Sequence, residues 1–244
     1  MERVAKAAQR SLRAAGRGAR IGGSPESSEV RPAPSAVSSQ ALTAGLSTGS
    51  GPRHGHTRLV LASASPRRRE LLAGLGLEFD VVPAHADETI ADGTDPRDAA
   101  CELARRKARI VAARTDAPVL AADTIVVAAD GGILGKPAGA SEARAMLRRL
   151  AGTTHRVITG VCLVTDGGKT LRDAADVTHV TMRELSPEEV EAYSGSGEPF
   201  GKAGGYAIQE RGDRFVTRVQ GSWTNVVGLP MELVGAMLAE AGIL

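Results

Sequence analysis

A nine-residue apolar run, Val119–Val127, contains one acid near its middle, Asp123. The length and hydrophobicity of the run predict a buried strand. Burying a carboxylate without a partner is strongly unfavourable. Asp123 is therefore expected to pair with a cation, to bind a metal ion or to act on a substrate. Alternatively, the carboxylate of Asp123 has a purely structural role and is stabilised by a buried arginine or by backbone N–H donors.

The first apolar run of the chain, Leu59–Ala62, predicts a strand that is followed at once by the start of a helix. Ser65 can cap this helix, and Pro66 suits the first helical position, where a missing N–H costs nothing. A helix N-terminus offers free N–H donors and partial positive charge, to which Arg67 and Arg68 add full charges. Phosphate is the anion that fits such a site best; an ordinary solvated helix start is the alternative.

Other charged residues follow predicted strands or lie in unusual places. Glu88 belongs to an acid pair just past a short strand, where it could bind a divalent cation or simply decorate a loop. Lys107 lies on or beside the apolar stripe of a helix, so its ammonium either reaches a partner or snorkels to solvent. Lys136 precedes a proline, and Lys202 lies in a glycine-rich loop that lacks the spacing of a P-loop. Cationic clamps together with a carboxylate-bound Mg²⁺ or Mn²⁺ are what attack at phosphorus requires.

Competing nucleophilic chemistries find no support in the sequence. Cys101 and Cys162 both lie in apolar periodic segments, which is typical of reduced core cysteines in a cytoplasmic protein. No Ser-His-Asp or Cys-His arrangement is visible, and none of the five histidines has a metal-ligand partner at helical spacing.

Residues 1–57 differ in composition from the rest of the chain. They carry eight Lys/Arg against three Asp/Glu, while residues 58–244 carry 22 against 25. The first segment is rich in Ala, Gly, Ser and Pro, which predicts a disordered basic tail ahead of one folded domain, 58–244. A targeting segment, a flexible tail and a start codon placed too far upstream are the explanations left open. The mild acidity of the domain argues against nucleic-acid binding, and no apolar run approaches the roughly 18 residues of a membrane span.

The rest of the pattern mixes strands and helices. Helices are expected to begin at or near Pro66, Pro96, Pro187 and Pro230. Strands are expected at 59–62, 79–83, 119–127 and 155–165, in a partner strand ending near 182, and at 206–209 and 214–220.

Six motifs then occur in order. They are Ser63-Ala64-Ser65-Pro66-Arg67-Arg68, Leu103-Ala104-Arg105-Arg106-Lys107-Ala108, Ala122-Asp123-Thr124, Gly135-Lys136-Pro137, Gly201-Lys202-Ala203-Gly204 and Gly221-Ser222-Trp223-Thr224-Asn225-Val226-Val227-Gly228-Leu229-Pro230. With them the chain, from about residue 58 to its C-terminus, closely resembles the Maf nucleoside triphosphate pyrophosphatases. The resemblance implies an α/β fold related to the inosine triphosphate pyrophosphatases: a long mixed twisted sheet flanked by helices, with two lobes around a central cleft. It also implies hydrolysis of a nucleoside triphosphate to the monophosphate and pyrophosphate with a divalent cation, and it allows a homodimer.

The resemblance also implies roles for single residues. Asp123 matches the proton acceptor of the family, and from the residues alone Asp123 and Glu88 are the acids expected to hold the metal ion. The positions that set base preference correspond to Arg67, Thr124 and Gln209. The phosphate or metal contacts correspond to Ser63, Arg68, Glu88, Lys107, Lys136 and Lys202.

Two further motifs bear on the base. Tyr-x-Ile-Gln at 206–209 and Gly-Ser-x-x-x-Val-Val-Gly-Leu-Pro at 221–230 resemble the subfamily that acts on dTTP, UTP and modified pyrimidine nucleotides. The amide of Gln209 offers both a donor and an acceptor, which suits the edge of a pyrimidine. Gly201 and Trp223 depart from this subfamily, where Asp and Tyr are common. The remaining alternatives are a 7-methyl-GTP pyrophosphatase and a non-catalytic regulator of cell division and septum formation.

Overall fold

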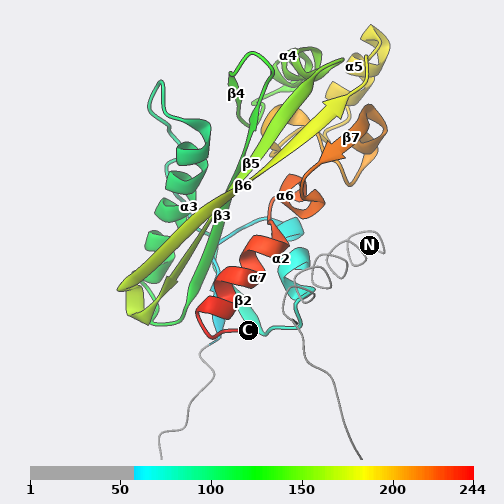
Figure 1. The fold of residues 1–244 in the computed structure, drawn as a ribbon. Coiled ribbons are helices and arrows are strands. Elements are labelled where there is room, and N and C mark those ends of the chain that lie inside the picture. The colour runs from blue at the N-terminus through cyan, green and yellow to red at the C-terminus, as the bar shows by residue number, and fades with distance from the viewer. Residues whose placement is uncertain (1–57) are drawn as a thin grey trace, which may run out of the picture.

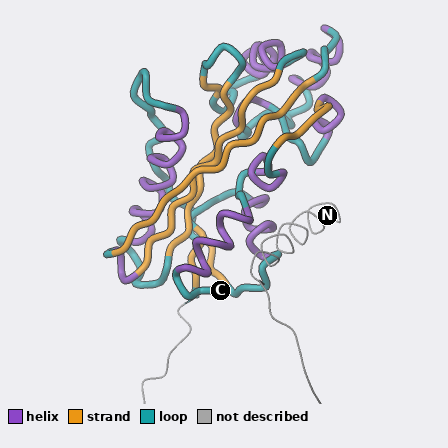
Figure 2. Tube along the Cα trace, viewed as in Figure 1, coloured by secondary structure: helices purple, strands orange, loops and turns teal. Residues whose placement is uncertain are grey.

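A computed structural model describes residues 58–244; the tail expected at residues 1–57 lies outside the described residues. The described part is built on one seven-stranded mixed sheet, which runs diagonally through Figures 1 and 2. Its strand order is β2-β1-β3-β5-β6-β7, with β4 paired to one end of β3. Helices lie on both faces, so the predicted mixed α/β architecture is confirmed.

The longest strands form the centre of the sheet. β1 pairs in parallel with β2 and β3, and the other pairs are antiparallel. The strands are β1 (Leu59–Leu61), β2 (Phe79–Val81), β3 (Val119–Val127), β4 (Ile133–Leu134), β5 (Thr154–Thr165), β6 (Thr170–Met182) and β7 (Val216–Gln220).

Three of the helices begin as their sequences predict, with a side-chain cap followed by proline. The cap residues are Ser65, Asp95 and Ser186, each accepting a hydrogen bond from a backbone N–H of the first turn. The helices are α2 (Pro66–Ala73), α3 (Pro96–Ala112), α4 (Ala140–Leu150), α5 (Pro187–Ser194), α6 (Trp223–Val227) and α7 (Met231–Glu240). Short 3-10 segments cover Asp166–Gly168, Ala203–Gly205 and Arg211–Phe215.

The two faces of the sheet are covered differently. α3 lies alone along one face, and α2, α6 and α7 lie on the other (Figure 1). Gly160 of β5 allows α3 this close approach, because a Cβ there would lie 2.3 Å from the carbonyl carbon of Ala100. Side chains alternate along a strand, so odd-numbered residues of β3 pack towards α3 and even-numbered residues pack towards the opposite face.

The face opposite α3 carries two separate hydrophobic clusters. One gathers α2 and α7 around residues such as Leu72 and Leu238, and the other gathers α4 and α5 around residues such as Leu147 and Tyr193. The helices of the two clusters lie at opposite ends of the long strands (Figure 1). These clusters correspond to the two predicted lobes.

One edge of β3 is open between these lobes. Leu120 pairs with Leu61 of β1, and Val126 pairs with Leu134 of β4. Within the described part of the chain, the residues between them have a strand neighbour only on the β5 side. Asp123 and Thr124 lie in this gap, Asp123 on the α3 face of the sheet and Thr124 on the opposite face.

The strand predicted at residues 206–209 is wrong. This segment has no strand pairing, because its polar groups bond to side chains instead of to a neighbouring strand. The backbone N–H of Ala207 donates to the hydroxyl of Tyr193, and the hydroxyl of Tyr206 contacts His155. β7 also begins two residues later than predicted, at Val216, because a 3-10 turn precedes it.

Candidate active site

A cleft of about 380 Å³ lies over the open edge of β3. It is lined by the loop before α2, by the start of α2, by β3 and by the segment 201–209. All ten residues that the sequence singled out line this one cleft: Ser63, Arg67, Arg68, Glu88, Lys107, Asp123, Thr124, Lys136, Lys202 and Gln209.

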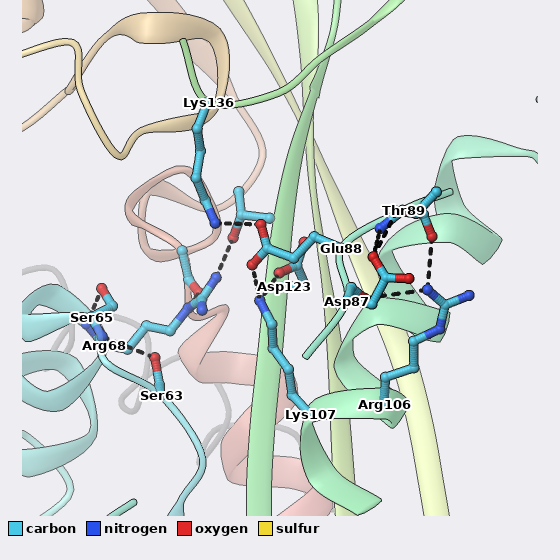
Figure 3. A network of polar contacts seen from close by, with 12 residues as sticks. Ser63, Ser65, Arg68, Asp87, Glu88, Thr89, Arg106, Lys107, Asp123 and Lys136 are labelled. Carbon is cyan, nitrogen blue, oxygen red and sulfur yellow. Dashed lines mark hydrogen bonds and ion pairs between the residues drawn. The ribbon is translucent and has the colours of Figure 1, made fainter. Parts of the chain in front are cut away.

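The α3 side of the cleft holds a chain of alternating charges, seen in Figure 3. The ammonium of Lys107 contacts Oδ1 of Asp123 and lies 2.8 Å from Oε1 of Glu88. Lys136 donates to the other oxygen of Glu88 at 2.6 Å. Lys107 is 8% exposed and Asp123 is 6% exposed, so each is the buried partner that the other requires. Lys107 therefore pairs inside the protein and does not snorkel to solvent.

These contacts fix the charge of Glu88. Burial alone would raise the pKa of this carboxyl, but hydrogen bonds from Lys107 and Lys136 outweigh burial and lower the pKa to about 2. Glu88 is therefore a carboxylate at neutral pH, and the cluster presents two carboxylates and two ammonium groups to the cleft.

The loop before α2 shapes the neighbouring wall. The hydroxyl of Ser63 accepts from the backbone N–H of Ser65, whose own hydroxyl accepts from the N–H of Arg68. Arg67 lines the cleft at the first turn of the helix, as the predicted anion site requires.

Arg68 ties three elements together. Its Nε donates to the carbonyl of Gly228 at 2.7 Å and its Nη2 donates to the hydroxyl of Thr124 at 3.0 Å. Burial lowers the pKa of Arg68, although the negative charge of Asp123 opposes that shift. The guanidinium thus joins α2 to β3 and to the end of α6, a role that the sequence did not reveal.

The other side of the cleft is mostly apolar. Thr124, Gln209 and the guanidinium of Arg68 are its polar groups, and the surrounding wall consists of Val126, Val157, Tyr206, Ala207, Ile208, Val226 and Val227. One cleft therefore has a charged half on the α3 side and an apolar half on the opposite side. Thr124 follows Asp123 directly in β3 and stands at the boundary between the halves.

Lys202 reaches the cleft from the glycine-rich loop. Its ammonium donates to the carbonyl of Glu198 at 2.5 Å and lies 3.6 Å from the carboxylate of Glu210. These contacts hold the lysine to its own loop, at the entrance to the segment that carries Gln209.

Sequence reasoning missed two buried residues behind the cleft, Thr159 and Asn225. Thr159 contacts the hydroxyl of Thr124 at 2.9 Å, and it donates to the carbonyl of Asn225 at 3.0 Å. Thr159 lies within the apolar run of β5, so a hydroxyl at an inward position was the available signal. Asn225 lies within a quoted motif, but only the fold brings it next to β5.

The two carboxylates fit a divalent cation of the magnesium type. Mg²⁺ is commonly held by one or two protein carboxylates, with phosphate oxygens and water completing the shell. Glu88 and Asp123 flank the ammonium of Lys107, so a cation held by both carboxylates would lie beside that ammonium. In residues 58–244 no group of three or more His, Cys, Asp or Glu side chains gathers as a metal site. The protein would therefore supply two ligands and a phosphate substrate would supply others.

Comparison with known proteins places the chain in a family. A sequence model described as Maf-like protein matches residues 58–241. The chain belongs to the Maf family. Among similar family members, a dTTP/UTP pyrophosphatase of Anaeromyxobacter dehalogenans (strain 2CP-C) is 52% identical over 188 residues, covering 76% of this chain and 94% of that protein. A dTTP/UTP pyrophosphatase of Moorella thermoacetica (strain ATCC 39073 / JCM 9320) is 48% identical over 192 residues, covering 77% and 96%.

A more distant likeness is to a solved structure, the HAM1 protein of Coxiella burnetii. It is 17% identical, covers 75% of this chain and 99% of that chain, and has a TM-score of 0.46. Among the described residues, no helix of this Maf family member is both long and apolar enough to cross a membrane.

Proposed function

We propose that this Maf family member hydrolyses dTTP and UTP, and modified pyrimidine nucleotides, to the monophosphate and pyrophosphate. The observation that carries the proposal is the divided cleft, which joins a cluster of ammonium groups and carboxylates to a mostly apolar pocket that carries Thr124, Gln209 and Arg68. The charged half suits a triphosphate and the apolar half suits a base. The names of relatives that are about half identical support the same substrates.

The residues divide the reaction between them. Lys136 and Lys202 bind the phosphates and neutralise the charge that builds up as the phosphoanhydride bond breaks. Asp123 accepts a proton from the attacking water, and the contact with Lys107 holds this carboxylate in place beforehand. The water oxygen ends in one product and the bridging oxygen leaves with the other, which balances the hydrolysis.

Glu88 and Asp123 would hold Mg²⁺ or Mn²⁺, which would neutralise phosphate charge and make the bound water easier to deprotonate. In the apolar half, Thr124 and Gln209 meet the polar edge of the base, and Arg67 reaches it from the start of α2. The Gln209 amide can donate and accept at once, as the edge of uracil or thymine requires.

A substrate panel tests the proposal. The full chain with Mg²⁺ or Mn²⁺ should release pyrophosphate, not orthophosphate, from dTTP and UTP, and it should do so faster than from 7-methyl-GTP. Asp123→Asn should lower kcat by roughly 10²-fold or more, since a positioned proton acceptor contributes about 10²–10⁴-fold. The circular dichroism of this variant should match that of the unchanged protein.

Each alternative has its own outcome in these assays. If the chain hydrolyses 7-methyl-GTP faster than dTTP and UTP, then 7-methyl-GTP is the substrate and the proposed assignment is wrong. An unchanged chain that binds UTP and metal but releases no pyrophosphate would overturn the enzymatic function. A regulator of cell division would keep its cellular effect in Asp123→Asn, whereas an effect that depends on hydrolysis would vanish.

The proposal extends to the whole protein. Residues 58–244 form the catalytic domain, and it acts in the cytoplasm without nucleic acid or membrane partners. Both cysteines, Cys101 and Cys162, are free and buried, which suits a reducing compartment. The resemblance implies a homodimer, and analytical ultracentrifugation of the full chain would test this by measuring its mass in solution.

A further inference from the structure

The hydroxyl of Thr124 is held by a fixed set of neighbours at the boundary of the cleft. Arg68 Nη2 lies 3.0 Å from it and can only donate. The hydroxyl of Thr159 lies 2.9 Å from it, and between two hydroxyls either can be the donor. The direction of this second hydrogen bond decides what Thr124 offers to a ligand.

The environment of Thr159 settles that direction. Thr159 is fully buried, with 0% of its surface exposed, and its hydroxyl lies 3.0 Å from the carbonyl oxygen of Asn225. A carbonyl oxygen can only accept, so the single proton of Thr159 points to Asn225. The contact between the two threonines is then a hydrogen bond only if Thr124 donates.

Asn225 is itself held firmly in place. Its side-chain amide donates to the carbonyl of Val157 at 3.0 Å and to the hydroxyl of Thr178 at 2.9 Å. Asn225 is 0% exposed, and its carbonyl also accepts from the N–H of Gly228. The acceptor that orients Thr159 therefore does not move with the ligand.

We propose that Thr159 is a positioning residue for base selection, because it takes the proton of Thr124 and leaves that hydroxyl only an acceptor to offer the cleft. This inference rests on the proposed function for the identity of the ligand, a pyrimidine nucleotide. Thr124 donates to Thr159 and accepts from Arg68, so its remaining lone pair can accept one N–H from a base. Uracil and thymine carry N–H at ring position 3, whereas cytosine carries a bare acceptor nitrogen there. The arrangement favours the first two bases over cytosine.

Substitution of Thr159 tests the mechanism. Thr159→Val keeps the shape but removes the hydroxyl, so Thr124 becomes free to turn its proton towards the ligand. The ratio of the Kd of CMP to the Kd of UMP, measured by titration calorimetry, should fall on the order of tenfold in this variant. The UTP-to-CTP ratio of kcat/KM should fall in parallel. Thr159→Ser retains the hydroxyl and should restore both ratios to within about twofold of the unchanged chain.

Thr178→Val is the matched control. It removes another fully buried hydroxyl from the same network, one that contacts Asn225 but not Thr124. It should lower the thermal stability while leaving the CMP-to-UMP ratio unchanged. In this control the main-chain carbonyl of Asn225 keeps its hydrogen bond from the N–H of Gly228, so Thr159 should stay oriented. Loss of selectivity in Thr178→Val as well would reduce Thr159 to a packing role and overturn the proposal.

A second measurement needs no variant. On the unchanged chain, 3-methyl-UMP, which lacks the N–H, should bind at least about tenfold more weakly than UMP. Equal binding of the two, or an unchanged ratio in Thr159→Val, would overturn the inference. So would a variant that altered only the preference between UMP and dUMP, since the hydroxyl would then face the sugar. Binding of a monophosphate needs no turnover, so a chain that selects UMP but releases no pyrophosphate would contradict the proposed function alone.

Discussion

The buried ion pair of Lys107 and Asp123 joins α3 to β3 at the floor of the cleft. An acid in an apolar strand and a lysine beside an apolar helical stripe each required a partner, and Asp123 and Lys107 turn out to be partners of each other. Their pairing was beyond the sequence because it depends on α3 crossing β3, which is a tertiary contact. Thr159 gives a weaker signal: its hydroxyl interrupts the apolar run of β5, but threonine is common in strands, so the residue type alone does not mark it as functional.

Lys107 and Lys136 both bind the carboxylate of Glu88, but Lys107 is buried and Lys136 is half exposed. The same substitution at the two positions should therefore lower the free energy of unfolding by different amounts. Lys107→Met leaves the buried Asp123 without the ammonium that contacts it, so the free energy of unfolding should fall by about 3 kcal/mol. Lys136 has a side chain that is 48% exposed, so Lys136→Met should cost under about 1 kcal/mol.

Urea denaturation with a pyrophosphate-release assay measures both effects. Both variants should lose turnover, because each removes a cation from the charged half of the cleft. Equal unfolding midpoints for the two variants would mean that the Lys107–Asp123 pair contributes no more to stability than a surface ion pair.

Among the helices and strands, the sequence predicted correctly those features that depend only on neighbouring residues, such as the starts of helices. The caps and prolines at the starts of α2, α3 and α5 are where they were expected, because each signal lies within a single helical turn. The segment 206–209 misled, because its alternating pattern resembles a strand while its partners are distant side chains. Tyr206 bonds to His155 on β5, a contact that no window of adjacent residues contains.

The His155–Tyr206 contact predicts a pH dependence of stability. His155 is 1% exposed, Nε2 lies 2.7 Å from the hydroxyl of Tyr206, and burial lowers the pKa of His155 to about 4. The unfolded chain takes up this proton below about pH 6.5, but the folded chain does so only near pH 4. The contribution is therefore fully present above pH 6.5, and the free energy of unfolding falls by on the order of 3 kcal/mol as the pH drops to 4.

His155→Gln keeps a polar partner for Tyr206 but cannot titrate, so its stability should vary less between pH 6.5 and 4. The exposed His179 supplies the control, since His179→Gln should retain the pH slope of the unchanged chain. Urea unfolding at several pH values gives the slopes, and parallel curves for all three proteins would refute the role of His155.

The site lies where the sheet has a gap, along the edge of β3 between its pairings with β1 and with β4. β1 pairs with β3 only as far as Leu120, and β4 pairs with β3 only from Val126 onward, so Asp123 and Thr124 are reachable from opposite faces. A triphosphate can then lie on the α3 side while its base lies on the other side. No local pattern in β3 announces this gap, because it depends on where two short neighbouring strands stop. The ordered motifs singled out residues that line one cleft, and only the strand register explains their division into two halves.

The extent of the domain gives the last prediction. The family match begins at residue 58, and the cleft residues in the described part of the chain begin at Ala62. Deletion of residues 1–57 should therefore leave kcat/KM for UTP within about twofold of the full chain, because it removes neither a buried strand nor a cleft residue of that part.

Deletion of residues 1–62 is the control that should fail to fold. It removes β1, whose residues Leu59, Val60 and Leu61 are at most 5% exposed and which joins β2 to β3. This longer deletion should yield no cooperatively folding protein in thermal denaturation. A large loss of turnover in the shorter deletion, with its melting transition intact, would show that the functional domain extends ahead of Arg58.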